Sequence, residues 1–252
     1  QAYLHDPGVK TFSEKFQNQQ IEPNELIGGY ASEDAVLQEL NDLTDMIFDQ
    51  EETAKFLCRK IYRQFVYYEI NEEVENDIIT PLAETFRNND YDVVPAIRQL
   101  LESQHFYDAD NAVTTDDHIG AIIKSPVELV MGALRFFDID IPQETEAFYH
   151  AYTNGILRFI DDQGMSFYEP VDVAGYPAYH QTPVYNRFWI TPNNIANRYQ
   201  LVTHLLNGEA TGLGFGLDIL SFVNNTISDP ADPDVIVTEL VAYMLPQDIS
   251  PD

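Results

Sequence analysis

Residues 49–107 read DQEETAKFLCRKIYRQFVYYEINEEVENDIITPLAETFRNNDYDVVPAIRQLLESQHFY, and residues 122–137 read IIKSPVELVMGALRFF. Apolar side chains recur in both stretches every three or four residues, which is the spacing of one helix face. Polar and charged side chains fill the remaining positions, as they do on the solvent face of an amphipathic helix. The two stretches therefore predict a run of packed amphipathic helices.

Start signals divide this region into separate helices. Asp49 and Glu52 have the spacing of a capping box, and Asn71 can cap a further helix whose first turn is acidic. The segment Ser125-Pro126-Val127-Glu128 combines a serine cap, a proline at the first helical position and a glutamate at the third. We predict that Ser125 and Glu128 form a reciprocal cap.

The rest of the chain extends the same helical pattern, with two exceptions. Residues 1–30 have mixed polarity and are expected to be irregular. Residues 164–190 hold several prolines and seven aromatic side chains, which indicates a long ordered loop. The prediction is an all-α fold, with residues 1–252 forming one compact multi-helix domain. The chain begins at Gln1 and shows no signal peptide, so we expect the C-terminal part of a longer protein.

The balance of acidic and basic residues limits the classes of partner that the chain is expected to bind. The sequence has 42 acidic and 13 basic residues, a formal net charge of −29. Nucleic-acid binding is not expected, because neutralising phosphates requires a basic surface. No apolar run reaches the roughly 18 residues of a membrane span. Neutral or cationic partners, such as a neutral glycan or a protein, remain compatible with this surface.

Metal and nucleophile signals are weak. Glu102 and His105 have the spacing of a di-iron ligand pair, but that site needs a second such pair, which is absent from the sequence. Residues 108–111 form an acidic stretch compatible with adventitious calcium, although the EF-hand glycine and glutamate are missing. Cys58 is expected in the core. We predict no metal site and no cofactor.

Two groups of residues are candidates for binding. Arg59 and Arg63 belong to a basic stripe on the helix after Asp49; they either pair with nearby acids or line a pocket for an anion. In the loop of residues 164–190, Tyr176, Tyr179 and Trp189 either pack inward or leave ring faces open for a neutral sugar.

Several motifs resemble one bacterial family. They are His5-Asp6-Pro7-Gly8-Val9-Lys10-Thr11-Phe12, Thr53-Ala54-Lys55-Phe56, Tyr91-Asp92, Lys124 to Glu128 with Arg135, residues 170–177, and Trp189 with Arg198. Together they resemble the domain of unknown function 1800 family, in which a tryptophan usually stands at the position of Tyr176. The resemblance implies an exported protein located outside the cytoplasm, and it carries over no established activity. It adds Arg198 to the candidate binding residues, and Lys124 and Arg135 face the same choice as Arg59 and Arg63, between pairing with acids and lining an anion pocket.

From these observations we expect a binding or assembly module of an exported bacterial protein. The alternative is a hydrolase that acts on an extracellular polymer with carboxylates beside the aromatic loop. Two ionisable groups converging in a pocket at that loop would favour the enzyme.

Overall fold

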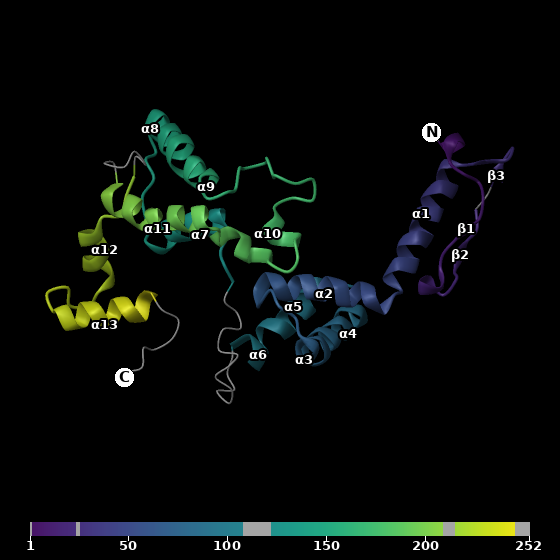
Figure 1. The fold of residues 1–252 in the computed structure, drawn as a ribbon, viewed down its shortest axis with the longest axis horizontal. Coiled ribbons are helices and arrows are strands. Elements are labelled where there is room, and N and C mark those ends of the chain that lie inside the picture. Colours follow the sequence, from purple (N-terminus) through teal and green to yellow (C-terminus); the bar gives the residue numbers. More distant parts are fainter. Residues whose placement is uncertain (1, 24–25, 108–121, 209–214, 245–252) are drawn as a thin grey trace. The chain divides into compact units, whose positions relative to one another are not determined.

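The computed structural model describes residues 2–23, 26–107, 122–208 and 215–244. Helices dominate these residues, so the all-α prediction is confirmed (Figure 1). Contacts between residues divide the chain into two units, residues 1–122 and residues 123–252, and each is described by itself. That the two form one domain stays a prediction. In the described ranges, no helix has the length and apolar character to cross a bilayer.

The first unit begins with two short hairpins and continues as helices. The hairpins pair β1 (Lys10–Thr11) with β2 (Gln20–Ile21) and β3 (Leu26–Ile27) with β4 (Tyr30–Ala31). The helices are α1 (Glu33–Phe48), α2 (Glu51–Phe65), α3 (Glu72–Val74), η3 (Glu75–Ile79), α4 (Thr80–Asn88), α5 (Val93–Leu101) and α6 (Gln104–Tyr107); η1 (Ala2–Leu4) and η2 (Glu14–Phe16) are short 3-10 turns. The expectation that residues 1–30 are irregular is therefore wrong for these strands.

The N-terminal segment is held onto α1 by charge. His5 Nε2 and Lys10 Nζ each lie 3.1 Å from Glu39 Oε1, and Glu39 is buried on α1. Lys10 also donates to the backbone carbonyls of Asp6 and Gly8. The His-Asp-Pro-Gly-Val-Lys motif therefore forms a loop that closes around one lysine.

The core of the first unit is formed by α2, η3, α4 and α5. Ala54, Cys58, Tyr62 and Val66 recur at intervals of four on α2 and are fully buried against Leu82 and Leu100, among others. Burying apolar side chains on one stripe is what holds such short helices together. Cys58 lies in this core, and burial raises the pKa of its thiol to about 11.

Two helix starts differ in their outcome. Asn71 Oδ1 accepts from the backbone amide of Val74, as predicted. The prediction of a capping box at Asp49 is wrong. The Asp49 amide donates to the backbone carbonyl of Asp45 and closes the end of α1. Gln50 occupies the cap position of α2, and its side chain makes no capping hydrogen bond.

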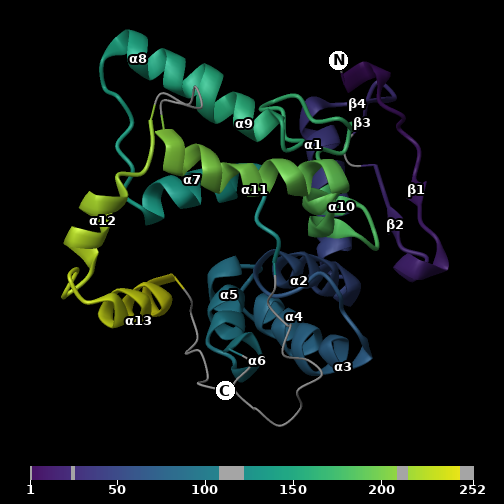
Figure 2. The same ribbon diagram turned by 60° about the vertical axis from the view of Figure 1, so that its left-hand side comes forward.

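The second unit is also helical (Figure 2). Its elements are α7 (Pro126–Phe136), α8 (Thr145–His150), η4 (Ala151–Leu157), α9 (Arg158–Asp161), α10 (Pro177–His180), η5 (Tyr185–Ile190), α11 (Pro192–Asn207), α12 (Ile219–Thr226) and α13 (Pro233–Met244). A single core joins Leu134 of α7, Phe159 and Ile160 of α9, and Leu201 and Leu205 of α11. These helices place the ends of α7 and α11 close to the start of α12.

The predicted start of α7 is confirmed. Ser125 Oγ accepts from the Glu128 amide at 3.3 Å, Glu128 Oε2 accepts from the Ser125 amide at 2.8 Å, and Pro126 is the first helical residue. Ser125 is 2% exposed, so the cap satisfies backbone groups that water does not reach.

Candidate functional site

Arg59 is engaged by two carboxylates. Its Nε and Nη2 donate to the two oxygens of Glu75 at 2.8 and 2.7 Å, and its Nη1 donates to Glu52 at 2.6 Å. Glu75 lies on η3, so the prediction that Arg59 or Arg63 pairs with an acid from another helix is confirmed. The hydrogen bonds to Glu75 and Glu52 raise the pKa of Arg59, and the bond from Arg59 lowers the pKa of Glu75. The charge of Arg59 is therefore already neutralised, which favours ion pairing over an anion pocket.

The other predicted bases are dispersed. Arg63 Nε donates to the backbone carbonyl of Tyr68 at 3.1 Å. Lys124 and Arg135 are exposed, the first just before α7 and the second in its last turn. Arg198 is partly buried on α11, and within the described ranges its Nη1 has no hydrogen-bond partner; burial lowers its pKa. Arg63 belongs to the first unit, whereas Lys124, Arg135 and Arg198 belong to the second, before α7, at its end and on α11.

Residues 164–190, the predicted aromatic loop, also contain the short helices α10 and η5, and ring contacts order this segment. Trp189 is 4% exposed, and the rings of Tyr176 and Tyr179 contact it with centroid distances of 5.9 and 5.8 Å. The Tyr176 hydroxyl donates to the backbone carbonyl of Ser166. Trp189 therefore has no open face for a sugar, whereas Tyr179 is half exposed.

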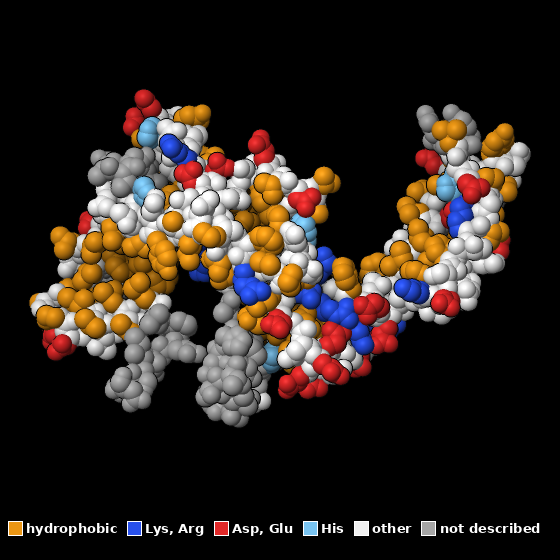
Figure 3. Space-filling view, viewed as in Figure 1, with side chains coloured by type: hydrophobic (Ala, Val, Ile, Leu, Met, Phe, Trp, Pro, Cys, Tyr) orange, Lys and Arg blue, Asp and Glu red, His pale blue; other side chains and the backbone are white. Residues whose placement is uncertain are grey.

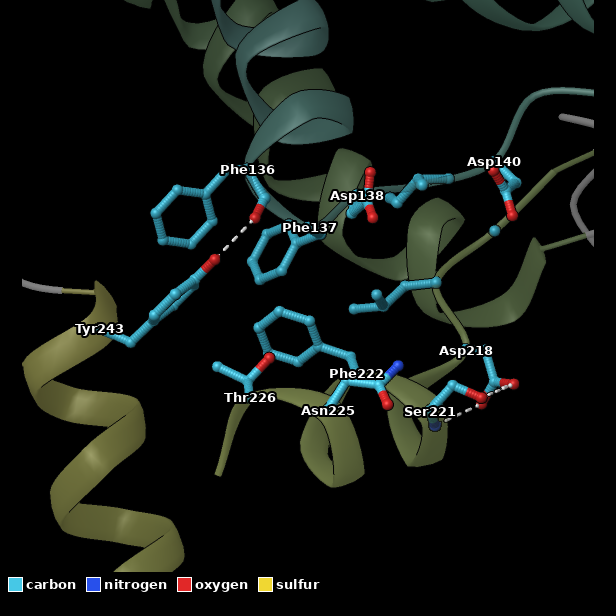
Figure 4. Close-up of a pocket in the computed structure, with 13 residues that line it drawn as sticks. Phe136, Phe137, Asp138, Asp140, Asp218, Ser221, Phe222, Asn225, Thr226 and Tyr243 are labelled. Atoms are coloured by element: carbon cyan, nitrogen blue, oxygen red, sulfur yellow. Dashed lines mark hydrogen bonds between the residues drawn. The ribbon is translucent and has the colours of Figure 1, made fainter. Parts of the chain in front are cut away.

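A pocket of about 480 Å³ lies elsewhere in the second unit, where the end of α7 meets α12 and the end of α13 (Figure 4). Four aromatic side chains line it: Phe136, Phe137, Phe222 and Tyr243, called here the aromatic quartet. The polar side chains that line the pocket are Asp138, Asp140, Asp218, Ser221, Asn225 and Thr226, and Figure 4 shows Thr226 beside Phe222. Ile139 and Leu217 line the pocket as well, so its three carboxylates share the lining with apolar side chains.

The quartet is a closed set of ring contacts. Phe136 contacts Phe137 and Tyr243, with centroid distances of 5.0 and 4.8 Å, and Phe222 contacts Phe137 and Tyr243 at 5.3 and 5.7 Å. Three of these pairs are inclined by 69–87°, the edge-to-face arrangement that aromatic quadrupoles favour, and the Phe136–Tyr243 pair is tilted by 53°. The Tyr243 hydroxyl donates to the Phe136 carbonyl at 3.1 Å and so ties α13 to α7.

Asp138 is placed by the end of α7. Its φ of 48° is left-handed, the Ile139 amide donates to Leu134 at 2.9 Å, and the Asp138 amide donates to Arg135 at 3.3 Å. This is the usual reversal at a helix C-terminus, where glycine or asparagine is preferred. A carboxylate there also faces the negative end of the helix dipole. The local backbone therefore gives no reason for the charge of Asp138.

Asp218 is placed by the start of α12. Its carboxylate accepts from the Ser221 amide at 3.0 Å and from Ser221 Oγ at 2.7 Å, which caps the helix. The hydrogen bonds from Ser221 lower the pKa of Asp218, so this carboxylate is ionised at neutral pH. It can accept hydrogen bonds or attract a cation, and it is a poor proton donor.

A close backbone approach brings Asp218 to the pocket. The Leu217 amide donates to the Leu205 carbonyl at 2.7 Å, which joins the end of α11 to the segment before α12. A Cβ on Gly216 would lie 2.5 Å from the Cα of Gly208, so no side chain fits at Gly216. The glycine is therefore needed for this close approach of the two backbone segments.

The sequence did not point to this pocket. Its lining residues come from segments about 80 and 105 residues apart in the chain and form no motif, so only the fold brings them together. The repeated acids after Phe137 and the cap at Asp218 are visible in the sequence, but both patterns are common on solvent-exposed surfaces. The described ranges contain no group of three or more His, Cys, Asp or Glu side chains able to hold a metal ion. The predicted calcium stretch, residues 108–111, lies outside the described residues.

Comparisons with known proteins give one result. A family model described as "Protein of unknown function (DUF1800)" matches residues 1–252. No curated protein and no solved structure matches significantly. The matched range includes the segments that carry the resemblance, from the loop closed by Lys10 to the capping box at Ser125 and the aromatic loop. The chain therefore belongs to the family described as protein of unknown function (DUF1800).

Proposed function

We propose that this chain is a binding module and that the pocket beside the aromatic quartet is its ligand site. The observation that supports this most is that aromatic side chains and acidic, hydrogen-bonding side chains line one cavity of about 480 Å³. Ligand pockets typically combine an apolar lining with a few polar groups that fix orientation, at volumes of roughly 300–1,000 Å³.

The surrounding surface supports the same role. Hydrophobic side chains gather where Figure 1 places α12 and α13, and the same area of Figure 3 is hollowed. Leu220 on α12 and Val237 on α13 are 76% and 63% exposed. Large exposed apolar areas mark binding surfaces more often than plain solvent-facing surface.

The hydrolase alternative receives less support. The hydrolase alternative requires carboxylates that converge beside the loop of residues 164–190. The three carboxylates instead line the pocket of the aromatic quartet, and Asp218, whose pKa is lowered, is suited to accept rather than to donate a proton. Export from a bacterial cytoplasm is part of the proposal and rests on the family resemblance alone.

Calorimetric titration tests the site. The chain is titrated with a panel of soluble neutral oligosaccharides and of short peptides of differing charge. Phe222→Leu, which removes one ring of the aromatic quartet, should weaken every ligand that binds. Tyr199→Ser removes an exposed ring on α11 that does not line the pocket and should change nothing. Ligands that depend on Tyr179 instead of Phe222, or a panel without any binding, would overturn the assignment.

A further inference from the structure

The pocket's charged groups all have one sign. Asp138, Asp140 and Asp218 line it, and no lysine, arginine or histidine does among the residues that the structure describes. Arg135, the base closest in sequence, is exposed on the last turn of α7 and is not a lining residue. Among the described lining residues, a ligand therefore meets three carboxylates and no base.

The aromatic side chains add to the negative electrostatic potential of these carboxylates. The face of an aromatic ring carries the negative end of its quadrupole and attracts ammonium and guanidinium groups that lie within about 6 Å of its centroid. In Figure 4, Phe137 and Phe222 are the rings of the quartet nearest to the carboxylates, and Phe136 and Tyr243 lie behind them. A cation beside Phe137 or Phe222 is attracted by the ring and by the carboxylates, whereas an anion is repelled by both.

Asp138 strengthens the case, because its charge has no local structural purpose. Asparagine or glycine suits its left-handed backbone at least as well, and the helix end disfavours a negative charge. The charge of Asp138 is therefore available to a ligand in the pocket that it lines.

We propose that the pocket binds an organic cation, namely an ammonium or guanidinium group attached to an apolar body. The apolar body packs on the aromatic quartet, and the cationic group lies toward Asp138 and Asp218. This inference rests on the proposed binding function and names the ligand class of that site.

Three probes of nearly equal shape separate charge from shape: phenethylamine, 2-phenylethanol and phenylacetate. Each is titrated calorimetrically into the full chain at low salt. The amine should bind at least about tenfold tighter than the alcohol, the combined effect expected of ring faces and exposed carboxylates. Phenylacetate should bind weakest. Added salt should weaken the amine and leave the alcohol unchanged.

Asp138→Asn is the informative variant. It removes the charge, keeps a residue that tolerates the left-handed backbone, and relieves the helix end, so the fold should be kept or slightly stabilised. The preference for the amine over the alcohol should fall, and alcohol binding should stay. Glu146→Gln is the control, because it removes one exposed charge from α8 outside the pocket.

The outcomes distinguish this inference from the function on which it rests. Equal affinity for amine and alcohol would overturn the cation preference and leave a binding pocket. An equal loss in Glu146→Gln and Asp138→Asn would show that only the overall charge matters, which also overturns it. Failure of all three probes to bind would overturn the cation inference, and the binding function would fall only if the oligosaccharide and peptide panel also failed to bind.

Discussion

The Arg59–Glu75 pair offers a quantitative test of the first unit. The perturbation is a double-mutant cycle of Arg59→Ala, Glu75→Ala and the double variant. The side chains are only 22% and 27% exposed, and two parallel N–H···O bonds of 2.8 and 2.7 Å join them. Exposed ion pairs couple by about 0.2–1 kcal/mol, and bidentate charged hydrogen bonds are roughly twice as strong. We therefore expect a coupling of about 1–2 kcal/mol at pH 7.

The assay is urea unfolding followed by circular dichroism, which gives the free energy of unfolding of each variant. Lys55 and Glu51 on the same α2 helix form the control pair, at 2.9 Å but with Glu51 66% exposed, and their coupling should be weaker. A coupling between Arg59 and Glu75 no larger than that of the control pair would refute the reasoning.

The pH dependence has a defined sign. The pKa of Glu75 is lowered in the folded state by the bond from Arg59, so the pair's contribution is fully present above the ordinary carboxyl value of 4.5. It is lost as the pH falls through the lowered folded value, where Glu75 becomes protonated. The cycle repeated at low pH should therefore give a smaller coupling than at pH 7.

Three further predictions concern single side chains. Ser125→Ala should lower the free energy of unfolding by about 0.5–2 kcal/mol, because the cap of α7 is lost, and Glu128→Gln should cost less because it keeps an acceptor; equal effects would contradict the reciprocal cap. Tyr62→Phe removes the 2.8 Å hydrogen bond to His105 from a buried site and should cost about 1 kcal/mol in the same unfolding assay; an unchanged stability would show that the bond contributes nothing. Trp189, the only tryptophan, should resist quenching by acrylamide and keep its emission when glycans are added; efficient quenching would contradict its burial.

Local signals in the sequence predicted local structure well where a single side chain determines where a helix begins. The cap at Asn71 and the box at Ser125 form as expected, because each oxygen has a backbone donor at a fixed spacing whatever the rest of the fold does. Asp49 shows the limit of such reasoning. Its backbone is used to end α1, so the following helix starts at the next residue without its side chain.

Burial and long-range contacts were harder to predict. The buried face of α2 passes through Tyr62 to Val66, just after the helix, whereas Phe65 in its last turn is 39% exposed. The apolar periodicity predicts that α2 has one buried face, but the neighbouring helices decide which residues lie at the middle of that face. The pocket is the extreme case, because Phe137 and Phe222 meet only after α7, α11 and α12 have packed. No spacing in a single sequence encodes that encounter.

The elements η3 and η4 are π-helical turns, and they fix which face of the following helix points toward the core. Between α8 and α9, the segment Ala151–Leu157 makes i to i+5 hydrogen bonds, which absorb one more residue than an α-helical turn. Each residue advances an α-helix by about 100°, so removing one residue here would turn α9 by that angle. Phe159 and Ile160 would then leave the core of the second unit. The packing of the second unit therefore depends more on the number of residues in this segment than on most of its individual side chains.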